Sequence, residues 1–174
     1  MSRIYAEEGI GEIDFNDPWM QQHSQRLIDS YQWALGKPLL DIALYQSPAE
    51  IAEALFLAEF ALLSHDVVDG PKGRDNVYNY SNRTGLKVFQ RSWQQQVGLA
   101  SSQSAEQKDN PQAVRNNRLA EALAKGHAVF DCERVTGSGG RVVLSSVVLF
   151  NVFDVVGVYL GQAALIQPQN YSYR

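Results

Sequence analysis

The sequence is poor in the residues and motifs that usually reveal a catalytic function. It has a single cysteine, Cys132, which excludes an internal disulfide and fits a reducing compartment. It lacks G-x-S-x-G, P-loop and H-E-x-x-H motifs. Its three histidines are scattered, without the spacing of metal ligands. We therefore expect no enzymatic activity, no catalytic residue and no metal site.

The chain also lacks an excess of positive charge. Its 15 lysines and arginines are outnumbered by 19 acidic residues, so the formal net charge is -4 and the pI is about 5.3. This balance disfavours binding to a phosphate backbone, and no nucleic acid is expected as a partner. Residues 1–11 contain Glu7 and Glu8 and no apolar core, which is unlike a signal peptide. We expect a cytoplasmic protein.

One long apolar run, residues 139–166, is the part around which the rest is organised. Its length fits a membrane span, but Asp154 would be costly in hydrocarbon. The run is rich in β-branched and aromatic residues, which favour strands. The D-V-V-G sequence at 154–157 is typical of a tight turn. We predict antiparallel strands at 141–153 and 157–167, and no membrane partner.

An amphipathic helix is predicted at 17–35. Asp17 and Pro18 are typical of its first residues, and Gly36 of its end. Apolar residues recur at steps of three and four. This stripe either docks on the chain's own core or packs on a second copy in a homodimer, and periodicity does not distinguish the two. The candidate partner residues are Trp19, His23, Leu27 and Tyr31.

The remaining elements complete an α+β domain. Further helices are predicted at 48–58, 83–90, from Trp93, and at 112–125, and further strands at 60–64, 77–80 and 128–136. The expected fold is a five-stranded antiparallel sheet with helices on one face, preceded by the amphipathic helix. The expected division is a flexible lead-in at 1–16, N-terminal helices at 17–58, the sheet domain at 59–167 and a tail at 168–174.

The order of elements and several short motifs resemble a known fold and family. The motifs are Pro18-Trp19, His23, Ser64-His65, Asn79-Tyr80-Ser81-Asn82, Phe89, Trp93, Ser104-Ala105-Glu106, Gly140-Arg141, Asn151, Asp154, Gly157 and Gly161-Gln162-Ala163-Ala164. The β-β-helices-β-β-β order resembles the PAS fold. The ordered set, over residues 17–167, resembles the MEKHLA domain family, a PAS-related group that includes short bacterial proteins.

The resemblance implies a sensory or ligand-binding module that acts in trans, without an attached output domain. A small-molecule pocket between sheet and helices would be bordered by Asn79, Asn82, Arg83, Phe89, Trp93, Arg141 and Gln162. Structural roles explain most of these residues as well, since Asn82 fits an N-cap and Trp93 a core position. The alternative is an interaction or dimerisation module with a filled core and an unknown protein partner.

Cofactors of the PAS fold receive little support from the sequence. Flavin photosensors carry their reactive cysteine in the helical insert, where this chain has none, so only non-covalent flavin remains open. Haem-binding relatives use a histidine in the helix before the third strand, whereas His127 follows Gly126, past that helix. The cofactor, if any, is left unassigned.

Overall fold

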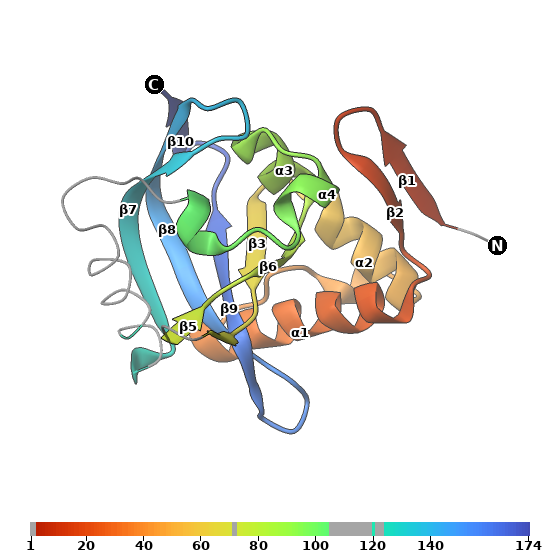
Figure 1. The fold of residues 1–174 in the computed structure, drawn as a ribbon. Helices are drawn as coiled ribbons and strands as arrows, with labels where there is room; N and C mark the ends of the chain where they lie inside the picture. Colours follow the sequence, from red (N-terminus) through yellow and green to blue (C-terminus); the bar gives the residue numbers. More distant parts are fainter. Residues whose placement is uncertain (1–2, 71–72, 105–119, 121–123) are drawn as a thin grey trace.

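A computed structural model describes residues 3–70, 73–104, 120 and 124–174 of the chain. The elements follow the predicted order, with additions at both ends (Figure 1). They are β1 (Ile4–Glu7), β2 (Gly11–Asp14), α1 (Pro18–Leu35), the 3-10 turn η1 (Ile42–Leu44), α2 (Pro48–Phe56), β3 (Ala61–His65), β4 (Val68–Gly70), β5 (Gly73–Asp75), β6 (Tyr78–Ser81), α3 (Arg83–Phe89), α4 (Trp93–Gln96), the 3-10 turn η2 (Ser101–Ser104), β7 (His127–Val135), β8 (Arg141–Phe153), β9 (Tyr159–Ile166) and β10 (Tyr171–Tyr173).

The main sheet is antiparallel and is built on the two long strands predicted from the apolar run. β9 pairs with β3 and β3 with β6 on one side, and β7 pairs along the other edge of β8. β10 pairs with residues 142–144 of β8 and so continues the line of β9 after a short interruption. The predicted tight turn is present, because the Gly157 amide donates to the Asp154 carbonyl at 3.1 Å. Among the described residues, no helix is long and apolar enough to cross a bilayer.

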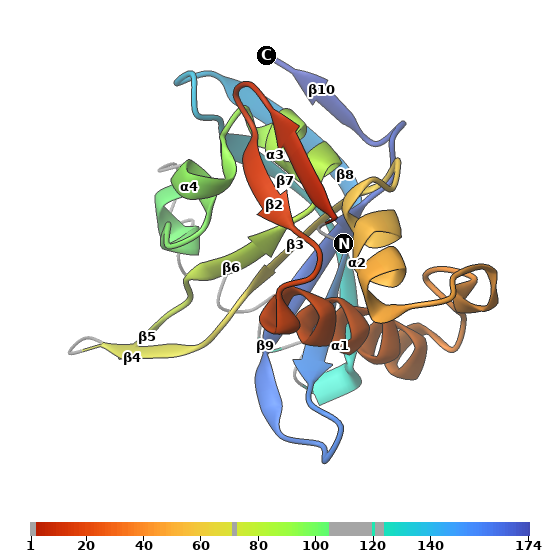
Figure 2. The same ribbon diagram turned by 90° about the vertical axis from the view of Figure 1, so that its right-hand side faces the viewer.

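Strand alternation divides the sheet into two apolar faces. The outer face carries Leu62, Phe150 and Leu165, which pack with α1 and α2 in one core cluster. The inner face carries Leu63 and Ile166, which pack with α3 residues in a second cluster. Figure 2 shows the central strands between α4 on one side and α2 on the other. Full burial of each such large apolar side chain contributes about 2 kcal/mol.

The N-terminal helices begin and end where the local signals predict. The Asp17 side chain accepts the Met20 amide at 3.1 Å, and Gly36 adopts the left-handed conformation that ends α1. Ser47 accepts the Glu50 amide at the start of α2. The stripe of α1 faces the outer surface of the chain's own sheet, where Leu27 is fully buried. In this structure the stripe therefore docks on the chain's own core.

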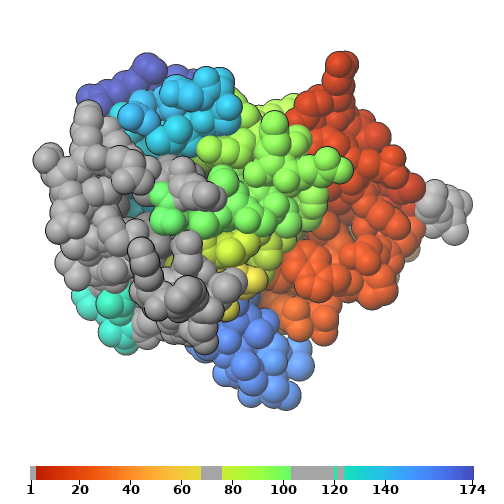
Figure 3. Space-filling view, in the orientation of Figure 1, coloured from red at the N-terminus to blue at the C-terminus, as the bar shows by residue number. Residues whose placement is uncertain are grey.

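The expectation of a loose lead-in is wrong for residues 4–14, which form the β1–β2 hairpin. Ile10, Ile13 and Phe15 are each under 5% exposed in the outer cluster. The Trp93 amide donates to the Ile10 carbonyl at 2.8 Å and ties the hairpin to α4. Figure 3 shows the red N-terminal segment against the body of the molecule. Burial of these three apolar side chains stabilises the hairpin, although their irregular spacing does not predict a strand or a helix.

The remaining differences from the sequence prediction are short strands. The tail expected at 168–174 contributes β10, and the β4–β5 ribbon is an addition between β3 and β6. The helix expected at 112–125 and residues 105–106 of the S-A-E motif lie largely or wholly outside the described residues.

Candidate functional site

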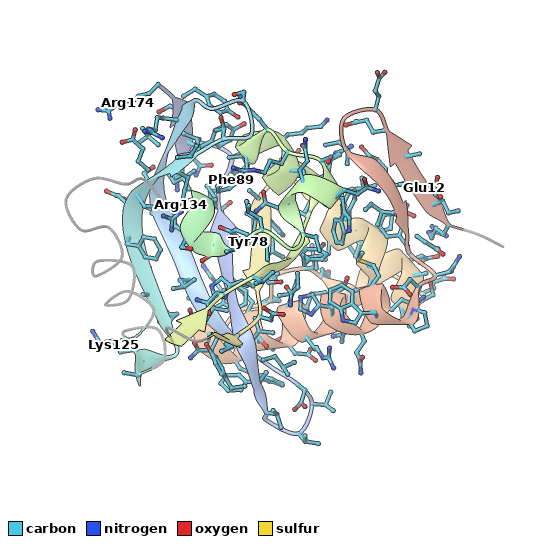
Figure 4. The ribbon with its side chains drawn as sticks, viewed as in Figure 1. Glu12, Tyr78, Phe89, Lys125, Arg134 and Arg174 are labelled. Atoms are coloured by element: carbon cyan, nitrogen blue, oxygen red, sulfur yellow. The ribbon has the colours of Figure 1, made fainter. Side chains whose placement is uncertain are left out.

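A small cavity lies on the inner face of the sheet, beneath α3 and η2. Its volume is about 60 Å³. Figure 4 shows three of its residues, Tyr78, Phe89 and Arg134, approaching from β6, α3 and β7. The lining residues are Leu63, His65, Tyr78, Phe89, Ser101, Phe130, Arg134, Leu144, Leu149, Ala164 and Ile166. The walls are therefore mostly apolar, with four residues that can offer polar groups.

Arg134 brings a charge to this inner face. It pairs with Val142 across β7 and β8, two positions from the Cys132–Leu144 pair whose members belong to the inner cluster. It is partly buried, and no hydrogen bond or ion pair within the described residues involves its guanidinium. Its guanidinium nitrogens are not fully buried, so solvent or a small molecule can reach them.

A row of polar side chains crosses the inner face beside the cavity. His65 of β3 lies opposite Gln162 of β9, which lies opposite Asn151 of β8. The Gln162 Nε2 donates to the Asn151 Oδ1 at 3.1 Å, and both residues are under 5% exposed. Of this row, only His65 is among the residues that line the cavity.

The structure does not gather the seven predicted pocket residues into one site, and only Phe89 lines the inner cavity. The Arg83 guanidinium lies over the Tyr5 ring at 5.9 Å, Arg141 is at the first residue of β8, and Gln162 bonds Asn151. Asn82 is fully buried, and its side chain forms hydrogen bonds with backbone groups of its own chain. The seven residues therefore do not line one shared pocket among the described residues.

Asn79 and Trp93 lie elsewhere, on an open groove of about 480 Å³ between the N-terminal hairpin, the start of α1 and α4. This groove was not foreseen, because the hairpin that forms one wall was taken for a lead-in. Its lining residues are Glu12, Ile13, Asp14, Asp17, Trp19, Met20, Asn79, Trp93 and Val97.

A buried polar network joins α1 to the sheet. The His23 Nε2 lies 2.8 Å from the Ser64 Oγ, and the Ser64 hydroxyl donates to the Asn79 Oδ1 at 2.6 Å. The Trp19 ring stacks on the His23 ring with centroids 4.6 Å apart. Burial, with a smaller effect of the Arg26 charge, lowers the pKa of His23 to about 3. Sequence reasoning placed His23 on the stripe but had no means of finding Ser64 as its partner.

The candidate partner stripe is largely occupied within the chain. His23, Leu27 and Tyr31 are at most 5% exposed, and Tyr31 meets Phe150 edge-on. Trp19 alone among the four keeps a sizeable exposed fraction, 38%. An interface made by the whole stripe would therefore require α1 to leave the sheet.

We expect acid to destabilise the protein through His23. The unfolded chain binds a proton on this imidazole below about pH 6.5, whereas the native state does so only near pH 3. Stability is therefore complete above pH 6.5 and is lost as the pH falls, by about 2 kcal/mol at pH 5. Urea unfolding of wild type and His23→Gln at pH 7.5 and 5 should show a smaller loss in the variant. An equal loss in both proteins would contradict this assignment.

Neither a metal nor a large cofactor fits the arrangement of the described residues. They contain no group of three or more histidine, cysteine, aspartate or glutamate side chains able to hold a metal ion. A cavity of about 150 Å³ is known to bind benzene, so 60 Å³ is far too small for a flavin or a haem. Cys132 lies on β7 and is in no disulfide, and His127 does not line the cavity.

Comparisons with known proteins agree with this geometry. The profile of the MEKHLA domain matches residues 21–171. The crystal structure of the PAS domain of a protein from Colwellia psychrerythraea is similar at 13% identity and a TM-score of 0.52, over 67% of this chain and 91% of that one. An RNA-binding light-oxygen-voltage receptor matches at 18% identity and a TM-score of 0.54, over 73% of this chain and 34% of that one. No curated protein matches the chain. At these identities the structural likeness shows a shared PAS fold.

Proposed function

Since this chain belongs to the MEKHLA domain family, we propose that it is a PAS-like sensory module that binds a small molecule in its inner cavity. The observation that carries the proposal is the cavity itself, which combines apolar walls with His65, Tyr78, Ser101 and Arg134. Pockets that bind small ligands are mostly apolar with a few placed polar groups. The proposal includes no catalytic step. The Ser64–His23 pair is assigned no catalytic role, because both side chains are at most 3% exposed.

β3 offers a physical route from the cavity to α1. Leu63 and His65 line the cavity on its inner side, while Ser64, between them, bonds His23 of α1 on the outer side. A ligand that shifts β3 would change the Ser64–His23 contact and bias the packing of α1. We propose that this is the output, and that a partner reads it in trans.

Filling the cavity is expected to abolish ligand binding. Ala164 lines it, and Ala164→Val adds two methyl groups in a space of about 60 Å³. Purified wild type, screened against small metabolites by thermal shift and native mass spectrometry, should bind at least one that this variant does not. Ala43→Val, in the exposed η1 turn, is the matched control and should bind like wild type. Hydrogen exchange of α1 should change when the ligand is added to wild type.

Failure of wild type to bind any compound would instead favour an interaction module. The small size of the cavity supports this second candidate, and so does an exposed apolar hairpin tip. Val155 and Val156 are 84% and 80% exposed at the turn between β8 and β9. The outer sheet face is covered by α1, so a partner would meet the tip rather than the sheet. Self-association measured by light scattering, without ligand binding, would support this alternative.

A further inference from the structure

We infer that the inner cavity takes a small planar oxyanion, a carboxylate of a few heavy atoms, anchored by Arg134. The inference rests on the proposed ligand-binding function and names the class of ligand. Three features carry it: the inward position of Arg134, the commitment of the neighbouring carboxylates to other partners, and the size of the cavity.

The acidic residues of β7 do not neutralise Arg134. Glu133 accepts from the Arg174 guanidinium at 3.0 Å, and the Asp131 carboxylate accepts the Ser146 amide at 2.9 Å. Glu133 and Asp131 are next in sequence to residues whose side chains face the inner cluster. Because side chains alternate along a strand, the two carboxylates lie on the opposite face of β7. Figure 4 shows Arg174 at the far end of this part of the sheet, away from the cavity. Within the described residues the Arg134 guanidinium therefore has no protein counter-ion.

The surroundings of Arg134 suit a planar anion. Phe130, Leu144 and Leu149 form an apolar wall beside Arg134, where water weakens a charge–charge contact less than it does on an open polar surface. A guanidinium can donate two parallel hydrogen bonds to the oxygens of one carboxylate.

The volume limits the ligand to a few atoms. The cavity of about 60 Å³ is less than half the size of one that holds benzene. Formate and acetate meet this limit and carry the required group. Because the affinity of so small a ligand is bounded by its atom count, we expect a Kd of roughly 0.1–10 mM.

The test is an NMR titration of the full chain at constant ionic strength, with acetate and formate against their neutral counterparts acetamide and formamide. We expect the two anions to shift amide signals of β7 and β3 saturably and the two amides not to do so.

Arg134→Gln is expected to weaken acetate binding at least tenfold, and Arg134→Lys less so. Arg174→Gln, which removes an exposed guanidinium paired with Glu133, is the matched control and should bind acetate like wild type. Arg134→Gln should melt no lower than wild type, because it removes an unpaired charge.

Three results would overturn the inference. The first is equal binding of acetamide and acetate, and the second is undiminished acetate binding in both Arg134 variants. The third is a protein that binds no anion but binds a neutral compound from the metabolite screen, with that binding blocked by Ala164→Val; this result would leave the proposed function standing.

Discussion

Replacing Asn82 with alanine is expected to lower the free energy of unfolding by about 4 kcal/mol. The side chain is fully buried and makes four hydrogen bonds. Its Oδ1 accepts the amides of Leu62 and Gly85 at 3.0 and 2.9 Å, and its Nδ2 donates to the carbonyls of Leu55 and Phe60 at 3.2 and 2.8 Å. Truncation removes the buried partner of the Leu62 and Gly85 amides and of the Phe60 carbonyl, which costs more than the mere loss of each bond. The Leu55 carbonyl still accepts the Ala58 amide at 3.4 Å.

Urea unfolding at pH 7.5 measures this effect, and Thr84→Ala is the matched control. Thr84 lies on the same helix and its hydroxyl donates a single bond, to the Ala58 carbonyl at 2.7 Å. Its loss should cost about 1 kcal/mol. A loss for Asn82→Ala no larger than that of the control would contradict the role assigned to this residue. Asn82→Asp should also destabilise the protein, because its second oxygen would face the Leu55 and Phe60 carbonyls, which require a donor.

Asn82 also illustrates what sequence reasoning can and cannot reach. The cap on α3 was predictable, because the acceptor and the Gly85 amide are three residues apart. The other three partners are 20 to 27 residues away in the chain and depend on how α2 and β3 return to this point. The sequence therefore makes Asn82 a candidate ligand contact, whereas in the fold its side chain holds α2, β3 and α3 together through hydrogen bonds.

Other elements are also predictable from the sequence where the residues that define their ends lie close together in the chain. α1, α2 and α3 carry caps within a few residues of their first turn, and the β8–β9 turn carries Asp154 and Gly157. The N-terminal hairpin has no such signal. Its stability comes from Ile10, Ile13 and Phe15 packing against segments far along the chain, and no pattern within 16 residues could report that. The resemblance to the MEKHLA family, in contrast, is confirmed over residues 21–171.

The candidate site was harder to predict because one irregularity inverts the alternation of β6. The register shifts between Ser64 and His65, so Tyr80 pairs with Ser64 and Tyr78 with His65. Tyr78 consequently belongs to the inner cluster and Tyr80 to the outer one, although alternation would place them together. The Asn79 Oδ1 accepts a hydrogen bond from the Ser64 hydroxyl on the α1 side of the sheet, so Asn79 does not enter the cavity. The lining residues come from seven separate elements, and spacing does not predict such convergence.

Gly161→Ala should be the most damaging single-methyl change in the sheet, with a loss of at least about 3 kcal/mol. Gly161 has a φ of 140°, which side chains rarely adopt, and an added Cβ would overlap the carbonyl oxygen of His65. The obstacle is backbone of β3 and cannot rotate away. β9 would have to separate from β3 beside the Gln162–His65 pair, at the edge of the cavity.

Gly157→Ala separates the two causes of this loss. Gly157 also has a positive φ, 89°, but lies in the exposed turn with open space around the position of a Cβ. It should lose only the conformational part, about 1 kcal/mol. Thermal and urea unfolding of both variants give the comparison, and absence of a cooperative transition in Gly161→Ala counts as the expected loss. Similar stabilities for the two variants would mean that β9 can move away from β3 at little cost. The strand pair would then be too compliant to transmit a ligand-induced shift from the cavity to Ser64 and α1.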